Sequence, residues 1–117
     1  MIIKRGNVCL ACLDPVVGRE ISITRPVVII SNDKNNEFSG TVTVLPITSG
    51  GAKRIYPFEV YLPKGTASLS KNSKVKADQI RTIDKNRIVK QYGQLSMSQL
   101  EQVERALAIH LCLPFAK

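Results

Sequence analysis

An arginine and two hydroxyl side chains stand next to predicted strands and could act together on a phosphate. Arg25 directly precedes a β-branched run over residues 27–30. Thr48 and Ser49 follow a strand predicted over residues 41–45. If these two strands are neighbours, both segments lie at one edge of the sheet. A guanidinium presents paired N–H donors that match phosphate geometry, and a hydroxyl adds another donor. Such an arrangement could stabilise negative charge on a phosphoryl group.

The same residues also have an ordinary structural interpretation. Arg25 could form a salt bridge with Glu20, and Thr48 could cap a turn. Arginines before strands are common, and exposed salt bridges are frequent without contributing much. The local pattern alone therefore favours the structural interpretation over the catalytic one.

Other kinds of catalytic or metal-binding site find little support. His110 is the single histidine, which excludes a two-histidine ribonuclease mechanism, and we expect it to be a packed or helix-terminal side chain. Cys9 and Cys12 have CxxC spacing, but in a strand residues three apart point to opposite faces. With Cys112 they make an odd number, so we expect small buried residues and no disulfide framework. We predict no metal and no cofactor.

The charge of the chain indicates a polyanionic partner. Seventeen lysines and arginines against nine acidic residues give a net charge of +8. The basic residues are spread along the chain, which favours a folded basic surface over a disordered arm. No apolar run approaches the roughly 18–20 residues of a membrane span. We expect a single domain over residues 1–117, soluble and cytoplasmic, with no membrane contact.

Hydrophobic periodicity predicts many short strands and one helix. Alternating or β-branched runs predict strands over residues 6–13, 27–30, 41–45, 56–62, 73–80 and 87–92. Polar or proline-containing stretches predict loops over residues 16–25, 31–40 and 46–51.

The helix is C-terminal and has a clear beginning. Its apolar stripe consists of Met97, Leu100, Val103, Leu107 and Leu111. Ser96 and Gln99 have the spacing of a capping box. The fold class is therefore mainly β with a C-terminal helix (α+β), as a small barrel or half-barrel that the helix closes on one side.

Several segments in order along the chain resemble one family of bacterial toxins. They are Arg5-Gly6, Leu13-Asp14-Pro15-Val16-Val17-Gly18, the run from Arg25 to Asp33, Pro46-Ile47-Thr48-Ser49 and the run from Ala77 to Lys85. Together they resemble the MazF/PemK toxins of type II toxin–antitoxin systems. The resemblance implies an SH3-like barrel, a homodimer and a metal-independent endoribonuclease. Such an enzyme cuts single-stranded RNA at short motifs and leaves a cyclic phosphate and a 5′-hydroxyl.

The resemblance also implies roles for individual residues. Arg25 and Thr48 stand where the family has its catalytic arginine and threonine. Because a guanidinium keeps its proton, we expect Arg25 to act electrostatically rather than as a base. The residues expected to bind RNA are Arg5, Arg19, Glu20, Ser49, Lys53, Arg54, Asp78 and Gln79. The loop after Gly18 differs from that of many relatives, so the cleavage motif does not transfer. Lys53-Arg54 also has the simpler interpretation of a solvated loop tip.

Two other functions fit the same architecture. A gyrase-poisoning toxin of this fold binds a protein and does not cleave RNA, but it would not need Arg25 and Thr48 together. A passive nucleic-acid-binding barrel usually offers aromatic stacking platforms, whereas this chain has three Tyr, three Phe and no Trp. The resemblance and the basic surface further predict an acidic antitoxin that lies across the RNA groove.

Overall fold

The computed structural model describes residues 1–13, 18 and 24–115. The strands are β1 (Asn7–Cys12), β2 (Thr24–Ile29), β3 (Thr41–Thr48), β4 (Glu59–Leu62), β5 (Ser73–Lys76), β6 (Arg81–Asp84) and β7 (Ile88–Gln94). The helices are α1 (Asp33–Phe38) and α2 (Met97–Leu111), with short 3-10 turns η1 (Thr66–Ser68), η2 (Ala77–Gln79) and η3 (Lys85–Arg87). Within the described ranges, neither helix is long and apolar enough to cross a membrane.

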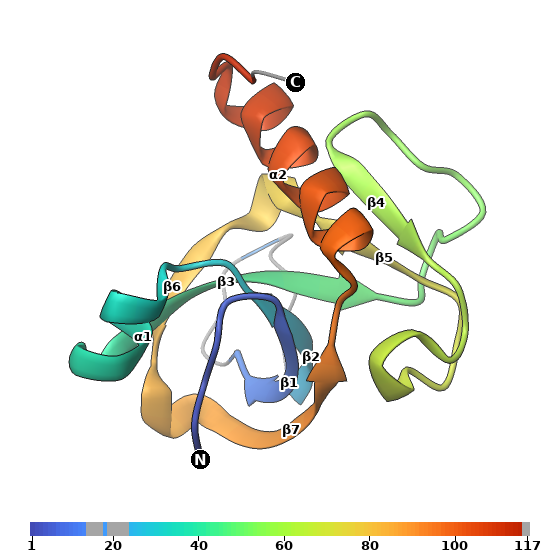
Figure 1. Ribbon diagram of the computed structural model, residues 1–117. Coiled ribbons are helices and arrows are strands. Elements are labelled where there is room, and N and C mark those ends of the chain that lie inside the picture. Colours follow the sequence, from blue (N-terminus) through green and yellow to red (C-terminus); the bar gives the residue numbers. More distant parts are fainter. Residues whose placement is uncertain (14–17, 19–23, 116–117) are drawn as a thin grey trace.

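All strand pairs in the sheet are antiparallel, and β3 is its central strand. The strand order is β4-β5-β3-β2-β1-β7, with β6 also paired to β3. β2 pairs with β3 through Val44 to Pro46. β6 pairs with its first part, Thr41 to Val44, and β5 pairs with its last two residues. β2 and β5 pair with adjoining residues of β3, so the C-terminal end of β3 lies between these two strands (Figure 1). The predicted mainly β fold with a C-terminal helix is confirmed.

Both faces of the central strands are buried, as the continuous apolar run over residues 27–30 predicts. Val28 packs into one core cluster together with Leu45 and, from α2, Val103. Val27 and Ile29 pack into a second cluster on the other face. This alternation follows from the two-residue period of a strand. It fixes the register of β2 on β3, because a shift by one residue would exchange the two faces.

Helix α2 begins and packs largely as the sequence predicts. The Ser96 side chain accepts a hydrogen bond from the Gln99 N–H, and the Gln99 side chain accepts one from the Ser96 N–H, which completes the capping box. Val103, in the middle of the predicted stripe, is fully buried. The stripe is exposed at its ends, where Met97 is 91% and Leu111 is 45% exposed. Figure 1 shows α2 running past β4 and β5 at one end of the sheet.

Two predicted loops are partly regular structure. Residues 33–38 form α1, which begins where Asn32 accepts a hydrogen bond from the Asn35 N–H; an Asn at this position is a common helix start. Strand β3 continues through Pro46 to Thr48 instead of ending at residue 45. Pro46 lies between the parts of β3 that pair with β6 and with β5, so its missing N–H is tolerated there.

The remaining differences concern strand limits. β2 begins at Thr24, so Arg25 lies within the strand and pairs with Ala11 of β1. The strand predicted over residues 56–62 is shorter, and β4 covers only Glu59–Leu62. Residues 77–79 form η2 rather than the end of a strand, and β6 was not predicted. Residues 16, 17 and 19–23 of the predicted loop lie outside the described residues.

Candidate active site

Arg25 and Thr48 lie at the same end of the β2–β3 pair. The pairing of these strands ends at Val27 with Pro46. When this antiparallel register is continued along both strands, it places Arg25 opposite Thr48. Opposite residues on neighbouring strands present their side chains on the same face of the sheet. Both residues are half-buried, and their cooperation at a phosphate stays a prediction, because Ile47 and Ser49 line the pocket beside Arg25 and Thr48 does not.

Arg25 lines a pocket of about 710 Å³, a volume typical of ligand sites. Ser49 lines the same pocket, as do Lys71 from the segment before β5 and Lys90 and Tyr92 from β7. The described lining contains three cationic side chains and no Asp or Glu. This concentration of positive charge suits an anionic ligand.

The hydroxyl of Thr48 holds the turn that follows β3. Its Oγ1 accepts a hydrogen bond of 3.1 Å from the Gly50 N–H, which is the turn-capping role considered from the sequence. Gly51 then adopts a positive φ of 70°, a conformation that favours glycine. Since a hydroxyl both accepts and donates, the capping bond leaves the hydroxyl hydrogen of Thr48 available for a phosphate oxygen. The structural and catalytic interpretations of Thr48 are therefore compatible.

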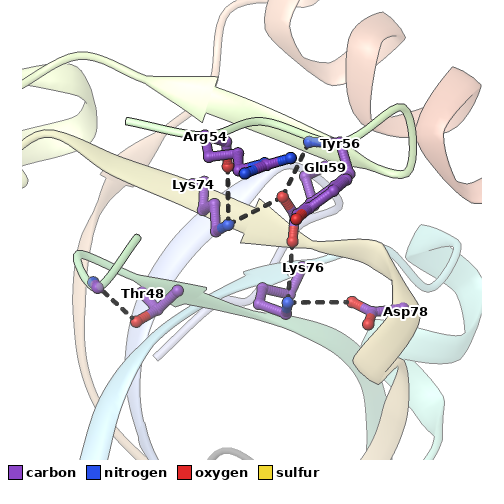
Figure 2. A network of polar contacts seen from close by, with 8 residues as sticks. Thr48, Arg54, Tyr56, Glu59, Lys74, Lys76 and Asp78 are labelled. Carbon is purple, nitrogen blue, oxygen red and sulfur yellow. Dashed lines mark hydrogen bonds and ion pairs between the residues drawn. The ribbon is translucent and has the colours of Figure 1, made fainter. Parts of the chain in front are cut away.

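A buried network of charged residues lies beside Thr48 (Figure 2). Lys74 of β5 is the register partner of Thr48, and its Nζ donates to Glu59 Oε1 at 2.9 Å. The same ammonium donates to the backbone oxygen of Arg54 at 3.0 Å. Lys76 Nζ donates to the other carboxylate oxygen of Glu59 at 2.8 Å. One buried carboxylate thus holds two lysines of β5, and one of these lysines holds the loop after Thr48.

The charge state of this network follows from its hydrogen bonds. Burial raises the pKa of Glu59, but the hydrogen bonds from Lys76 and Lys74 outweigh this effect and hold that pKa below its usual range. Burial lowers the pKa of Lys76. The hydrogen bond to Glu59 and the charge of Asp78 raise it by more, so the pKa lies above its usual range. Both residues are therefore ionised at neutral pH.

Asp78 and Gln79, both predicted to contact RNA, lie in η2 at the far end of the network. Asp78 Oδ1 is 3.8 Å from Lys76 Nζ. This oxygen is buried and accepts no hydrogen bond from the described residues. The ion pair with Lys76 connects Asp78 through Glu59 to the loop after Thr48 (Figure 2).

Lys53 and Arg54 lie on that loop, and both are exposed. Lys53 lines a second pocket of about 790 Å³, and Ser49 belongs to both pockets. The Arg54 guanidinium lies 5.5 Å from the centre of the Tyr56 ring. Tyr56 in turn stacks on Phe58, so the arginine side chain is supported by aromatic packing rather than being a freely solvated tip.

Arg5, which was also predicted to bind RNA, does not line the pocket. Arg5 Nη1 forms an ion pair of 2.8 Å with Glu104 of α2, and Arg5 Nε donates to the Ile30 backbone oxygen. Both contacts tie the N-terminal segment to the fold. Arg19 and Glu20 lie outside the described residues.

Lys71, Lys90 and the Glu59 network were not predicted from the sequence. Lys71 and Lys90 meet at one pocket only because β7 pairs with β1, and no local pattern reveals that pairing. A signal for the network was present, because Lys74 and Lys76 have the two-residue spacing of one strand face. Glu59 is the register partner of Lys76.

The cysteines and the histidine behave largely as ordinary structural residues. Cys9 is fully buried, and burial raises the pKa of its thiol to about 11. The expected burial is wrong for Cys112, which is exposed just after α2, and Cys12 is only half-buried; all three are free. His110 lies in the last turn of α2, with its ring 6.2 Å from that of Phe58. Over the described residues, no three His, Cys, Asp or Glu side chains are grouped as they would be around a metal ion.

Comparison with known proteins assigns the family. Residues 4–111 match the family model described as PemK-like, MazF-like toxin of type II toxin–antitoxin system. Endoribonuclease MazF9 of Mycobacterium tuberculosis is 38% identical over 96% of this chain and 98% of its own length. Endoribonuclease MazF of Staphylococcus epidermidis is 45% identical over 96% of this chain and 93% of its own. The crystal structure of MazF from Deinococcus radiodurans superposes with a TM-score of 0.83 at 26% identity, covering 97% of this chain and 99% of that one. The chain therefore belongs to the PemK-like, MazF-like toxins of type II toxin–antitoxin systems.

Proposed function

We propose that this toxin cleaves single-stranded RNA in the cytoplasm without a metal ion, at the site formed by Arg25 and Thr48. The protein is an RNA-cleaving enzyme, as its curated relatives named endoribonucleases are. In the proposed reaction the 2′-hydroxyl attacks the adjacent phosphorus and the P–O5′ bond breaks. The products are a 2′,3′-cyclic phosphate and a 5′-hydroxyl, and the hydroxyl proton passes to the leaving oxygen.

The placement of Arg25 carries this proposal. The β2–β3 register, if extended by two residues beyond the Val27–Pro46 pair, would set it opposite Thr48, and it lines a pocket whose described lining has three cations and no carboxylate. Its guanidinium would hold the non-bridging oxygens of the phosphate as negative charge builds on them. The Thr48 hydroxyl, already oriented by the Gly50 N–H, would donate to one of the same oxygens.

Further residues are proposed to contact RNA away from the cleaved bond. Ser49 and Lys53 line the adjoining pockets, and Arg54 lies on the same loop. Asp78 and Gln79 would read bases, and Arg5, Arg19 and Glu20 complete the proposed set. The buried Glu59 network supports the proposal because it joins the loop after Thr48 to η2.

The decisive experiment is cleavage of a long single-stranded RNA in excess chelator. We expect the native protein to cut the RNA, and the new ends should carry a cyclic phosphate and a 5′-hydroxyl by mass spectrometry. Arg25→Ala and Thr48→Ala should lose the activity, while Thr48→Ser should keep much of it because the hydroxyl remains. Lys34→Ala, at an exposed lysine of α1, is the matched control.

Each other outcome has a definite meaning. Intact RNA in every lane would contradict RNA cleavage and return attention to a gyrase-poison-like or passive binding function, which the endoribonuclease relatives do not favour. Equal cutting by all variants would mean that the catalytic residues lie elsewhere. Activity that disappears with chelator and returns with a divalent ion would contradict the metal-independent mechanism.

An antitoxin partner follows from the family, and we propose that it is acidic and that the toxin acts as a homodimer. The net charge of +8 favours an acidic partner. Near the end of α2, Ile109 and Leu113 are 47% and 56% exposed and could receive apolar side chains of that partner. Addition of the purified acidic partner should suppress RNA cleavage, and unchanged cleavage would contradict the proposal. Light scattering should give twice the chain mass for the toxin alone.

A further inference from the structure

The pocket beside Arg25 extends past the proposed cleavage site to two lysines from different parts of the chain. Lys71 comes from the segment between β4 and β5, and Lys90 comes from β7. Both lysines are exposed. Among the described residues, neither ammonium lies within 4.0 Å of a carboxylate, whereas Lys74 and Lys76 of the buried network both do. No described carboxylate therefore neutralises their charge, which suits an anionic ligand.

The segment that carries Lys71 is held in a defined shape. Its two ends are joined where the Lys64 N–H donates to Asn72 Oδ1 at 2.8 Å. A further hydrogen bond of 2.8 Å runs from the Gly65 N–H to the Leu69 backbone oxygen. The Leu69 side chain is buried in the core cluster that α2 covers. A pocket wall anchored in this way places its lysine without a large loss of conformational freedom on binding.

The backbone of this segment is strained where it meets β7. Ala67 and Ser68 have φ angles of 47° and 66°, in the left-handed region that non-glycine residues rarely adopt. Ala67 lies close against Gly93 of β7, where even a Cβ would come within 3.2 Å of the Ala67 Cα. Such strain persists only where the surrounding structure enforces it, and it is frequent at ligand sites. Here the close contact between Ala67 and Gly93 holds the Lys71 segment against the strand that carries Lys90.

Lys90 is also oriented by its neighbour. Its Nζ lies 5.6 Å from the centre of the Tyr92 ring, and both residues line the pocket. Attraction between the ammonium and the aromatic face favours this position without neutralising the charge.

We propose that Lys71 and Lys90 form a second phosphate-binding site, which holds backbone phosphates of the RNA strand next to the phosphate that is cleaved. The site rests on the proposed function, since it shares its pocket with Arg25. The described lining offers cations and hydroxyls without a carboxylate, which suits the sugar–phosphate backbone. Lys71 and Lys90 would therefore contribute to RNA affinity with little effect on the chemical step.

The test measures the salt dependence of RNA binding and the kinetics of cleavage separately. The cleavage site is first mapped in a long RNA, and an oligonucleotide containing it is made with 2′-O-methyl riboses so that it binds without being cut. Each phosphate contact in single-stranded nucleic acid contributes about 0.7 to the slope of log affinity against log salt. Lys71→Ala and Lys90→Ala should each reduce that slope by about 0.7, and the double variant by about twice as much. Lys34→Ala, an exposed lysine outside this pocket, should not change it.

Cleavage of the unmodified oligonucleotide separates binding from chemistry. The two lysine variants should raise KM about tenfold or less each while kcat stays within about twofold, and Lys71→Arg should restore most of the binding. Native-like slopes and KM values in the double variant would overturn the second site while leaving the proposed cleavage intact. The same conclusion would follow if the lysine variants weakened only the binding of an acidic protein partner. If the native protein neither bound nor cut RNA, the proposed function itself would fail, and the second site with it.

Discussion

The protein has two clusters of basic side chains, and they differ in burial and in pairing. Lys74 and Lys76 are largely buried and share the carboxylate of Glu59. Lys71 and Lys90 are exposed beside Arg25, in a pocket whose described lining has no carboxylate. Removing charges from water costs free energy that only close pairing offsets, so the first cluster can shape the chain but has no charge left for a ligand. In the second cluster no described carboxylate neutralises the lysines, so their charge can attract an anion.

Thr48 lies in β3 between the buried cluster on β5 and the strand that carries Arg25. On one side, the β3–β5 register pairs it with Lys74 of the buried network. On the other side, the β2–β3 register, extended by two residues beyond the Val27–Pro46 pair, sets it opposite Arg25, whose side chain lines the open pocket. The buried cluster therefore stabilises the strand and the loop from which the proposed hydroxyl donor reaches the phosphate. We expect substitutions in the buried cluster to lower the stability of the fold. Substitutions in the open pocket should instead impair RNA binding or cleavage.

The largest expected effect is on stability, from removal of the shared carboxylate. Glu59→Ala leaves two lysine ammoniums without their partner and should lower the free energy of unfolding by about 3–5 kcal/mol. Glu37→Ala, an exposed glutamate of α1, should change it by no more than about 0.5 kcal/mol. Urea denaturation followed by circular dichroism measures both. If Glu59→Ala does not fold, Glu59→Gln, which keeps the shape, should fold with reduced stability. A Glu59→Gln protein as stable as the native one would contradict the structural role of the network.

The opposite signature is expected at Arg25. Arg25→Ala removes the main donor to the phosphate and should lower kcat by about 10²–10³-fold. Its unfolding free energy should change by no more than about 1 kcal/mol, as for other partly exposed charges. Single-turnover cleavage and urea denaturation of the same sample separate the two effects. A large loss of stability in Arg25→Ala would show that this arginine belongs with the structural cluster.

The sequence predicted the proposed catalytic pair but neither of the two lysine clusters. Arg25 and Thr48 stand in contiguous motifs of a family pattern, so local sequence and resemblance identify them. The burial of Val27 to Ile29 and the capping box of α2 also follow from short-range periodicity. Lys71 and Lys90 have no such signal, because their proximity depends on the long-range pairing of β7 with β1. Strand β6 was missed for a similar reason, since its run Arg81–Asp84 has only Ile83 buried and is defined by its pairing with β3.

The pH dependence of stability gives a finer test of the buried cluster. The pKa of folded Glu59 lies below its usual range, so its ionised form stabilises the protein fully above the ordinary glutamate pKa of about 4.3. That contribution is lost as the pH falls through the lower pKa of the folded state. The raised pKa of Lys76 acts in the opposite direction, and its contribution is lost only when the pH rises above the ordinary lysine value of about 10.4.

The stability difference between the native protein and Glu59→Gln should therefore be constant from about pH 5 to pH 9 and shrink below about pH 4. Urea midpoints measured at pH 7, 5 and 3 on both proteins provide the comparison. A difference that stays the same at pH 3 would mean that packing, rather than the charge of Glu59, accounts for the lost stability.

The smallest expected effect concerns the position of Lys71 relative to Lys90 rather than the charge of these lysines. In Gly93→Ala the added methyl group would come within 3.2 Å of the Ala67 Cα, so the strained segment before Lys71 must move by a few tenths of an ångström. Lys71 would keep its charge but lose its alignment with Lys90. The KM for RNA should rise about two- to fivefold, equivalent to about 0.4–1 kcal/mol, with kcat nearly unchanged. Gly40→Ala is the matched control, because its added methyl group meets nothing within 4 Å.

If Gly93→Ala binds RNA like the native protein and Lys71→Ala does not, a lysine near the pocket is sufficient and its exact alignment is unimportant. A higher KM in both variants would show that the strained contact between η1 and β7 serves to place the phosphate-binding lysine.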